Sequence, residues 1–256
     1  MEFSDLIETI NQFYPEVMDQ PGEVFFGSRD SLRKSNGIAI IGLNPGGNGQ
    51  LSTIRENLNN YENNITRSDF SGYLDQCWHE PEFSKYQTCE RCKNSLKINK
   101  IIHQVRHQRM IKEIADESGF DLRKTISTNA IWAQTRSVRE LRELLRSQGT
   151  NTMDIFTEKY FKIFNHIFKK CSIDFVLCLG NGAYDSPLAL FAHALGVKEV
   201  NNIGNNYRDG KFFTANIEGR CTTFLGIAHP SMHTTTANGI EKIKEQLKSR
   251  LSENNS

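Results

Sequence analysis

The sequence predicts an α/β fold, a three-layer α/β/α sandwich around a central, mostly parallel sheet of four to five strands. The sheet is predicted by short apolar runs rich in β-branched residues, which are nearly continuous, as buried parallel strands are. The covering layers are predicted by segments with helical spacing of apolar residues that alternate with these runs. A length of 256 residues suits one large domain with an insertion better than two domains.

Taken in chain order, the predicted elements alternate. Four strands, each too short for a helix, are expected at residues 37–43, 125–131, 174–179 and 222–228. Five helices are expected at residues 96–117, 138–146, 152–170, 183–195 and 240–251. Ligands of open parallel sheets bind outside the carboxyl ends of the strands, so the loops that follow the strands are the candidate site. We expect one domain over residues 1–256, with a metal-binding insertion at residues 70–95.

Composition excludes a membrane-spanning protein. The chain is 38% hydrophobic and 24% charged, and no apolar run reaches the roughly 20 residues that a bilayer requires. Residues 1–5 contain neither a basic nor an apolar signal region, so we expect a cytoplasmic location. The six cysteines are then expected to be reduced thiols or metal ligands. Among them Cys171, Cys178 and Cys221 stand in apolar surroundings and are expected to be buried.

The net charge of +1 neither supports nor excludes a nucleic-acid partner, because a polyanion needs a local basic face. Lysine and arginine do gather at residues 93–112 and 136–146. Such stretches are often only the solvated faces of helices. Charge therefore leaves both interpretations open.

A glycine-rich loop follows the first predicted strand and reads Gly42-Leu43-Asn44-Pro45-Gly46-Gly47-Asn48-Gly49. Glycine lets backbone approach a ligand closely. The phosphate-binding patterns G-x-x-x-x-G-K-[ST] and G-x-G-x-x-G with a following acidic residue are both absent. A nucleotide-binding loop is therefore disfavoured.

The last predicted strand runs into His229-Pro230-Ser231-Met232-His233. The first histidine thus follows the carboxyl end of a strand, beside a proline that stiffens the turn. A lone histidine at such a position is often structural, so the motif gains meaning only together with the first loop.

Together the two loops, G-L-N-P-G and H-P-S, resemble the paired catalytic motifs of the uracil-DNA glycosylase superfamily. That family's first motif reads G-Q-D-P-Y, G-I-N-P-G or G-M-N-P-G, and its second reads H-P-S or N-P-S. Residues 126–131 resemble the strand whose terminal asparagine reads the extruded base, and Asn129 is the match. Residues 176–183 resemble the strand-glycine-helix step before the second motif. The resemblance covers most of residues 37–240, excluding the insertion.

The resemblance implies a monofunctional DNA glycosylase, which flips out a base and hydrolyses its N-glycosidic bond. Asn44 would position the attacking water and His229 would hydrogen-bond the O2 of the base, while an amide cannot serve as a general base. Asn129 would read the edge of uracil or cytosine. The pocket would be completed by Gly42, Leu43, Pro45, Gly46 and a stacking aromatic, for which Phe70 is preferred over Tyr73. DNA contacts would come from Ser231, Met232 and His233, either of the last two serving as a wedge.

Gly46 falls where uracil-specific members carry a tyrosine that excludes substituents on the pyrimidine C5. The space left open suits a uracil-like or a modified pyrimidine. One alternative is an anti-phage defence glycosylase that excises a bulky cytosine, such as glucosylated hydroxymethylcytosine. Another is a non-catalytic module that binds damaged DNA. We expect a monomer whose partner is DNA, acting in base-excision repair or in antiviral defence.

The insertion carries the pattern Cys77-x-His79-x9-Cys89-x2-Cys92, which predicts a structural zinc site with four ligands. A competing set joins Cys89 and Cys92 to His103 and His107, but its histidines lie far along the predicted helix. An iron-sulfur cluster is a further alternative, although the four-cysteine pattern of that family is absent. No metal is expected to serve the chemistry.

Overall fold

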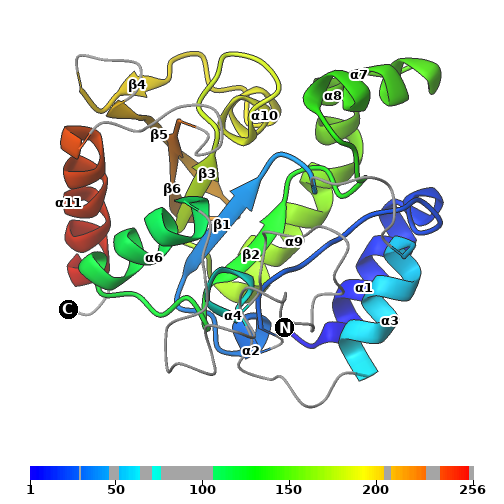
Figure 1. Ribbon diagram of the computed structural model, residues 1–256, viewed down its shortest axis with the longest axis horizontal. Coiled ribbons are helices and arrows are strands. Elements are labelled where there is room, and N and C mark those ends of the chain that lie inside the picture. Colours follow the sequence, from blue (N-terminus) through cyan, green and yellow to red (C-terminus); the bar gives the residue numbers. More distant parts are fainter. Residues whose placement is uncertain are drawn as a thin grey trace.

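The computed structural model describes residues 1–28, 30–45, 52–63, 71–75, 106–204, 209–228 and 237–253. Within them the strands form one mixed six-stranded sheet in the order β2-β1-β3-β6-β5-β4 (Figure 1). The strand bounds are β1 Ile38–Gly42, β2 Ile126–Asn129, β3 Phe175–Leu179, β4 Asn201–Asn202, β5 Lys211–Ile217 and β6 Arg220–Ile227.

Four neighbouring strands, β2, β1, β3 and β6, are parallel. They match the four predicted strands, and every residue of β1, β2 and β3 is buried. Burial on both faces explains why their sequences read as continuous apolar runs. Because the strands are parallel, their carboxyl ends meet at one edge of the sheet, which we call the carboxyl edge; the opposite end is the amino edge.

The predicted strand number was too small, because β5 and β4 extend the sheet in antiparallel fashion. β5 forms a hairpin with β6 whose turn holds Glu218 and Gly219 at positive φ. Its burial is partial and irregular, so its sequence lacks an apolar run. β4 has two exposed residues, too few for any periodic signal.

Helices cover both faces of the sheet, as predicted (Figure 1). Alternate residues of β1 point to opposite sides: Ala39 and Ile41 join one core, Ile38 and Ile40 the other. The first core is closed by α1 (Phe3–Phe13), α9 (Phe161–Cys171) and α10 (Pro187–Ala194). The second is closed by α4 (Gly72–Asp75), α6 (Arg106–Ser118) and α11 (Ala237–Glu253).

The remaining described helices are α2 (Asp30–Arg33), α3 (Ile54–Asn63), α7 (Val138–Ser147), α8 (Thr152–Ile155) and the short 3-10 turn Pro15–Val17. The predicted helix at 152–170 is α8 and α9 joined through a π-helical turn, Phe156–Tyr160. α10 begins later than predicted, because Ser186 caps it and Pro187 occupies its first turn. For the helix predicted at 96–117, the structure describes only the part from residue 106.

Lys244 joins α11 to α6. Its side chain is 3% exposed and its ammonium pairs with Glu117 at 2.6 Å, Glu241 at 2.9 Å and Glu113 at 3.6 Å. Burial opposes the charge, but the hydrogen bonds to Glu117 and Glu241 outweigh it and raise the pKa of Lys244. The three carboxylates thus compensate a buried cation and lock the two helices together.

The outer edge of β2 is covered by the chain's own N-terminal region. Gly22 and Phe25 form isolated antiparallel bridges to Ala133 and Thr128. Phe26 N also donates to Ser127 O at 3.1 Å. This segment supplies partners for backbone groups that an edge strand leaves unpaired.

Among the described helices, none combines the length and apolarity needed to cross a membrane. The cysteine prediction was partly wrong: Cys171 and Cys178 are buried, but Cys221 is exposed. Cys221 lies on β6 near the hairpin turn, before the strand enters the core. Burial raises the pKa of the Cys171 thiol to about 11 and that of Cys178 further still.

Candidate functional site

Three asparagines stand at the carboxyl edge, each at or just beyond the end of a different parallel strand. Asn44 comes two residues after β1, Asn129 ends β2, and Asn181 comes two residues after β3. Asn129 and Asn181 are buried, with 4% and 9% of their surface exposed, and Asn44 is half-buried. β6 ends at the same edge. The carboxyl edge therefore gathers neutral groups that can both donate and accept hydrogen bonds.

The loop after β1 stays attached to the segment after β2. Ala130 N donates to Gly42 O and Ile131 N donates to Leu43 O, both at 2.8 Å, and Thr135 N donates to Pro45 O at 3.3 Å. Leu43 and Pro45 are buried. Backbone pairing thus continues past the last strand residue and fixes the position of Asn44.

The amide of Asn44 has a defined orientation. Its Nδ2 donates to Thr135 Oγ1 at 2.9 Å, to Pro45 O at 3.1 Å and to Ala133 O at 3.5 Å. All three partners present oxygen, so the nitrogen must face them and the carbonyl oxygen must face the other way. Within the described part of the chain, Asn44 Oδ1 has no hydrogen-bond partner, so it can accept a hydrogen bond from a ligand or a water molecule.

Thr135 orients Asn44 from the neighbouring segment. Its hydroxyl accepts from Asn44 Nδ2 and donates to Ser137 O at 3.0 Å. Ser137 in turn caps α7, because its side chain accepts from Glu140 N at 3.2 Å. The chain of bonds anchors the Asn44 amide to the start of a helix. Sequence reasoning missed Thr135, since its partner is 91 positions away.

Asn129 ends β2, the strand that pairs with β1. It is the register partner of Gly42, and a Cβ atom added at Gly42 would stand 2.5 Å from Asn129 Oδ1. Glycine at position 42 is therefore required by the space that the Asn129 amide occupies. No hydrogen bond to the Asn129 side chain is formed by any residue that the structure describes. A buried amide in this condition has its full hydrogen-bonding capacity left for a ligand or water.

The loop between β3 and α10 completes this edge. Ser186 Oγ donates to Gly182 O at 2.7 Å and closes the loop, and Asp185 has a left-handed backbone with φ of 46°. A Cβ at Gly226 of β6 would stand 2.6 Å from Leu188 Cδ2 and 3.0 Å from the Cβ of Asn181, so this glycine makes room for both side chains. Asn181 was within a segment singled out from sequence, but it was not among the predicted site residues.

Tyr73 is a core residue. Its side chain is fully buried, and its ring packs against the rings of Phe26 and His107 at centroid distances of 5.9 and 6.0 Å. Burial raises the pKa of its hydroxyl far above the ordinary value. Because its side chain is fully buried, Tyr73 is not available to stack on a base, and the choice of Phe70 stays a prediction.

Many predicted site residues lie outside the described residues: Gly46, Phe70, Cys77, His79, Cys89, Cys92, His103, His229, Ser231, Met232 and His233. Their predicted roles stay predictions. Over the part of the chain that the structure describes, no three His, Cys, Asp or Glu side chains form a group that could hold a metal ion. The predicted zinc ligands are all in the undescribed part, so the zinc prediction is untouched by this finding.

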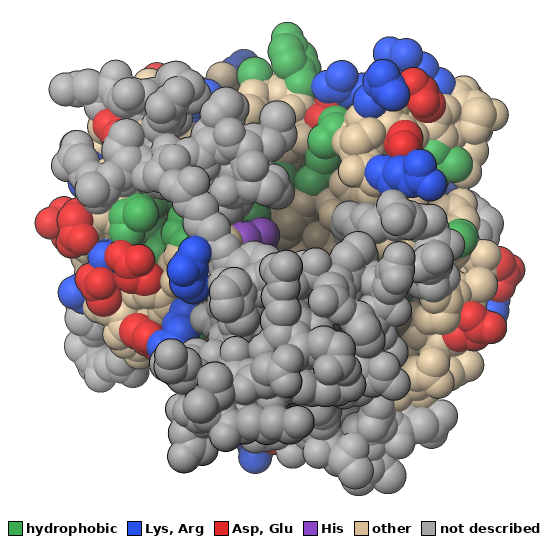
Figure 2. Space-filling view, in the orientation of Figure 1, with side chains coloured by type: hydrophobic (Ala, Val, Ile, Leu, Met, Phe, Trp, Pro, Cys, Tyr) green, Lys and Arg blue, Asp and Glu red, His purple; other side chains and the backbone are tan. Residues whose placement is uncertain are grey.

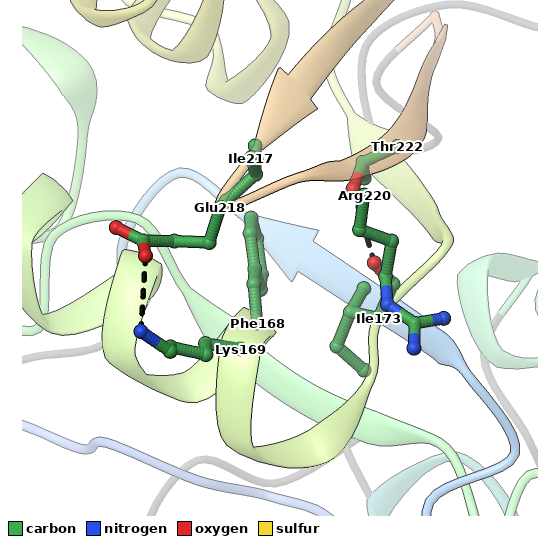
Figure 3. Close-up of a pocket in the computed structure, with 7 residues that line it drawn as sticks. All are labelled: Phe168, Lys169, Ile173, Ile217, Glu218, Arg220 and Thr222. Atoms are coloured by element: carbon green, nitrogen blue, oxygen red, sulfur yellow. Dashed lines mark hydrogen bonds and ion pairs between the residues drawn. The ribbon is translucent and has the colours of Figure 1, made fainter.

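A cavity of about 180 Å³ lies at the amino edge, between α9 and the β5–β6 hairpin (Figure 3). Two ion pairs flank it, Lys169 with Glu218 at 3.0 Å and Arg220 with Asp174 at 2.7 Å. Each cation thus has its own carboxylate. Apolar side chains, among them Phe168 and Ile173, lie between the two cations (Figure 3). The charges beside this cavity are neutralised, and the cavity lies opposite the carboxyl ends of the strands, where ligands of such sheets bind. We therefore interpret it as a gap in the packing and not as a binding site.

The carboxyl edge is therefore the candidate site, built from Asn44, Thr135, Asn129 and Gly42. A hollow is visible in Figure 2 over the region where Figure 1 places the tips of β1 and β2. The site can hold a neutral polar group and a water molecule through oriented amides. A comparison with known proteins finds no family model that matches the chain and no curated protein with significant similarity to it.

Proposed function

We propose that the chain is a monofunctional DNA glycosylase that flips out a uracil-like or modified pyrimidine and hydrolyses its N-glycosidic bond. The observation that carries the proposal is the pair of amides at the carboxyl edge. Neither the oxygen of Asn44 nor the buried side chain of Asn129 has a hydrogen-bond partner among the described residues. The G-L-N-P-G and H-P-S motifs support it from the sequence.

Hydrolysis needs a water molecule held beside the sugar C1′. The oxygen of Asn44 would accept one hydrogen bond from this water and aim its lone pair at C1′, without removing a proton. The C1′–N bond breaks as the C1′–O bond forms, its electron pair leaves with the base, and the proton of the water passes to solvent. In this scheme Thr135 is a positioning residue, because it acts through the Asn44 amide.

Base recognition would fall to Asn129. An amide presents one donor group and one acceptor, which match the edge of uracil in one orientation and that of cytosine in the other. The absence of a fixed partner for Asn129 in the described residues leaves either orientation open. His229 would stabilise the leaving base by a hydrogen bond, as the sequence motif predicts.

The test is an abasic-site assay. Purified protein is incubated with duplexes that carry uracil, 5-hydroxymethyluracil, hypoxanthine or glucosylated hydroxymethylcytosine, and abasic sites are then cleaved with alkali. The variants are Asn44→Ala, Asn129→Ala and His229→Ala. Asn59→Ala is the matched control, because it makes the same chemical change on the exposed surface of α3.

We expect strand breaks with at least one duplex, reduced about 100-fold by Asn44→Ala and unchanged by Asn59→Ala. The duplex that reacts assigns the substrate class, and a response limited to the glucosylated base would place the enzyme in antiviral defence. If no duplex gives product and the Asn44→Ala and His229→Ala variants still bind DNA, the proposal of a glycosylase is overturned. A non-catalytic DNA-binding module is then favoured.

A further inference from the structure

An aromatic side chain protrudes from the loop between β3 and α10. Tyr184 is 79% exposed, about twice the fraction of Phe13, the other large hydrophobic side chain found exposed among the described residues. An exposed aromatic ring costs solvation free energy unless it meets a partner. The loop follows the carboxyl end of β3, so Tyr184 stands at the same edge as the candidate site.

The backbone that carries Tyr184 is held firmly. Asp185 adopts a left-handed conformation, and its carboxylate, 10% exposed, accepts hydrogen bonds from Arg142 Nε at 2.7 Å and from the hydroxyl of Thr152. A non-glycine residue in this conformation costs about 1 kcal/mol or more and persists where the surroundings impose it. The bonds from α7 and α8 impose it here, and they fix the loop that presents the ring.

The neighbouring helix α7 offers positive charge. Arg139, Arg142 and Arg146 share one exposed face, opposite the buried Leu141 and Leu145. Lys and Arg side chains gather over α7 in Figure 2, across from a hydrophobic side chain that protrudes near α10, and the surface below them is hollowed.

Acidic groups neutralise this face only in part. Arg139 pairs with Glu143 at 3.7 Å, and Arg142 with Asp185. Within the described residues, the guanidinium groups of Arg146 and of the exposed Arg136, which precedes the helix, form no ion pair, although the backbone N of Arg136 donates to Glu140 at 2.9 Å. Arg136 directly follows Thr135, the residue that holds Asn44, so the positive face begins at the candidate site.

We propose that Tyr184 and the arginine face of α7, namely Arg136, Arg139, Arg142 and Arg146, bind single-stranded DNA next to the reacting nucleotide. The inference rests on the proposed function and extends it to the form of the substrate. The ring of Tyr184 stacks on an unpaired base, and the guanidinium groups contact phosphates. This combination of a cationic track and an exposed aromatic is how proteins hold single strands without reading sequence. In a duplex the flanking bases are already stacked on one another.

The test measures binding by fluorescence anisotropy on a labelled single strand of about 16 ordinary nucleotides and on the matching duplex. Tyr184→Ala removes the ring, Tyr184→Phe keeps it, and Phe13→Ala is the control for loss of an exposed aromatic elsewhere. We expect the Kd for the single strand to rise about tenfold in Tyr184→Ala and to stay unchanged in the other two variants.

The double variant Arg139→Ala/Arg146→Ala is expected to reduce the slope of log K against log salt by about 1.4, the value for two phosphate contacts on a single strand. The inference is overturned if Tyr184→Ala leaves single-strand affinity unchanged or weakens duplex binding equally. It is also overturned if polyglutamate competes for the surface as well as DNA does, because an acidic protein would then be the better partner.

The two proposals can fail separately, because this binding assay needs no turnover. If the protein excises no base but needs Tyr184 to bind a single strand, the proposed glycosylase activity is refuted and the proposed binding surface stands. If the protein is an active glycosylase whose affinity for a single strand does not depend on Tyr184, only the proposed binding surface is refuted.

Discussion

The amino edge and the carboxyl edge of the central sheet differ in how their polar side chains are paired. At the amino edge two ion pairs join charged side chains, Lys169 with Glu218 and Arg220 with Asp174. At the carboxyl edge, two amides have unused hydrogen-bonding capacity, because Asn44 Oδ1 and the whole Asn129 side chain have no partner among the described residues. Polar groups with unused capacity can bind a ligand or a water molecule, which is why we place the candidate site at this edge.

Glycine sharpens this contrast. At the carboxyl edge, Gly42 leaves space that the Asn129 side chain occupies, and Gly226 leaves space for Leu188 and Asn181. The amino edge has Gly37 and Gly219, both at positive φ, where the backbone conformation explains the residue. Gly37 and Gly219 therefore serve the chain path, whereas Gly42 and Gly226 make room for neighbouring side chains.

The largest expected effect comes from filling the space at Gly42. In Gly42→Ala the new methyl group stands 2.5 Å from Asn129 Oδ1 and must displace the amide, which is the free end of a side chain. We expect base excision to fall about 100-fold, because a shift near 1 Å is enough to cost that much. The fold is expected to tolerate the change, so the melting temperature should hardly move.

A double-mutant cycle tests the cause. In an Asn129→Ala background the colliding oxygen is gone, so adding Gly42→Ala is expected to cause no further loss of activity. Additive losses would show that Gly42 acts by some route other than Asn129.

A smaller effect is expected at Thr135, which anchors the Asn44 amide. Thr135→Val keeps the shape and removes the hydroxyl, so kcat is expected to fall about tenfold, equivalent to ~1.4 kcal/mol for one hydrogen bond, with little change in KM. Thr135→Ser keeps the hydroxyl and is expected to restore kcat. Wild-type kcat in Thr135→Val would contradict this role and mean that Asn44 is oriented by the carbonyl groups of Pro45 and Ala133 alone.

Substitutions at the amino edge test the opposite expectation, a small loss of stability without loss of activity. Arg220→Ala and Lys169→Ala each remove one exposed ion pair, which is worth about 0–1 kcal/mol. We expect urea unfolding to show a loss within this range and excision to stay at the wild-type rate. A variant that unfolds normally but loses activity would contradict the assignment of function to the opposite edge.

The smallest effect concerns a histidine remote from both edges. Burial, together with Lys170, lowers the pKa of His166 in the folded state. The unfolded chain therefore binds this proton more readily, so the stability from neutral His166 is present above pH 6.5 and is lost as pH falls through the folded pKa. We expect His166→Gln to reduce the fall in melting temperature below pH 6.5.

The parallel half of the sheet could be predicted from sequence because burial on both faces leaves continuous apolar runs. β5 could not, since a strand that is only partly covered has a mixed composition. α1 is different: Leu6 and Ile10 are fully buried and four apart, so its helical spacing was present in the sequence, although it was not predicted.

Within the site, Asn44 and Asn129 were predicted from motifs, and the structure brings them to adjacent strands. The orientation of Asn44 could not be predicted, because it depends on Thr135 and on the carbonyl groups of Pro45 and Ala133. These contacts exist only after residues 130–135 have paired with the end of β1. Motifs thus predicted the chemical groups, whereas tertiary structure decides which atom of the Asn44 amide has no partner among the described residues.

The segment that covers the outer edge of β2 has a consequence for the behaviour of the chain in solution. An uncovered strand can pair with another molecule and begin aggregation, but here Gly22 and Phe25 already occupy that edge, and β4 at the other end of the sheet is two residues long. Residues 22–26 therefore block intermolecular strand pairing at this side of the sheet, and a chain in which this segment is displaced is expected to aggregate through β2.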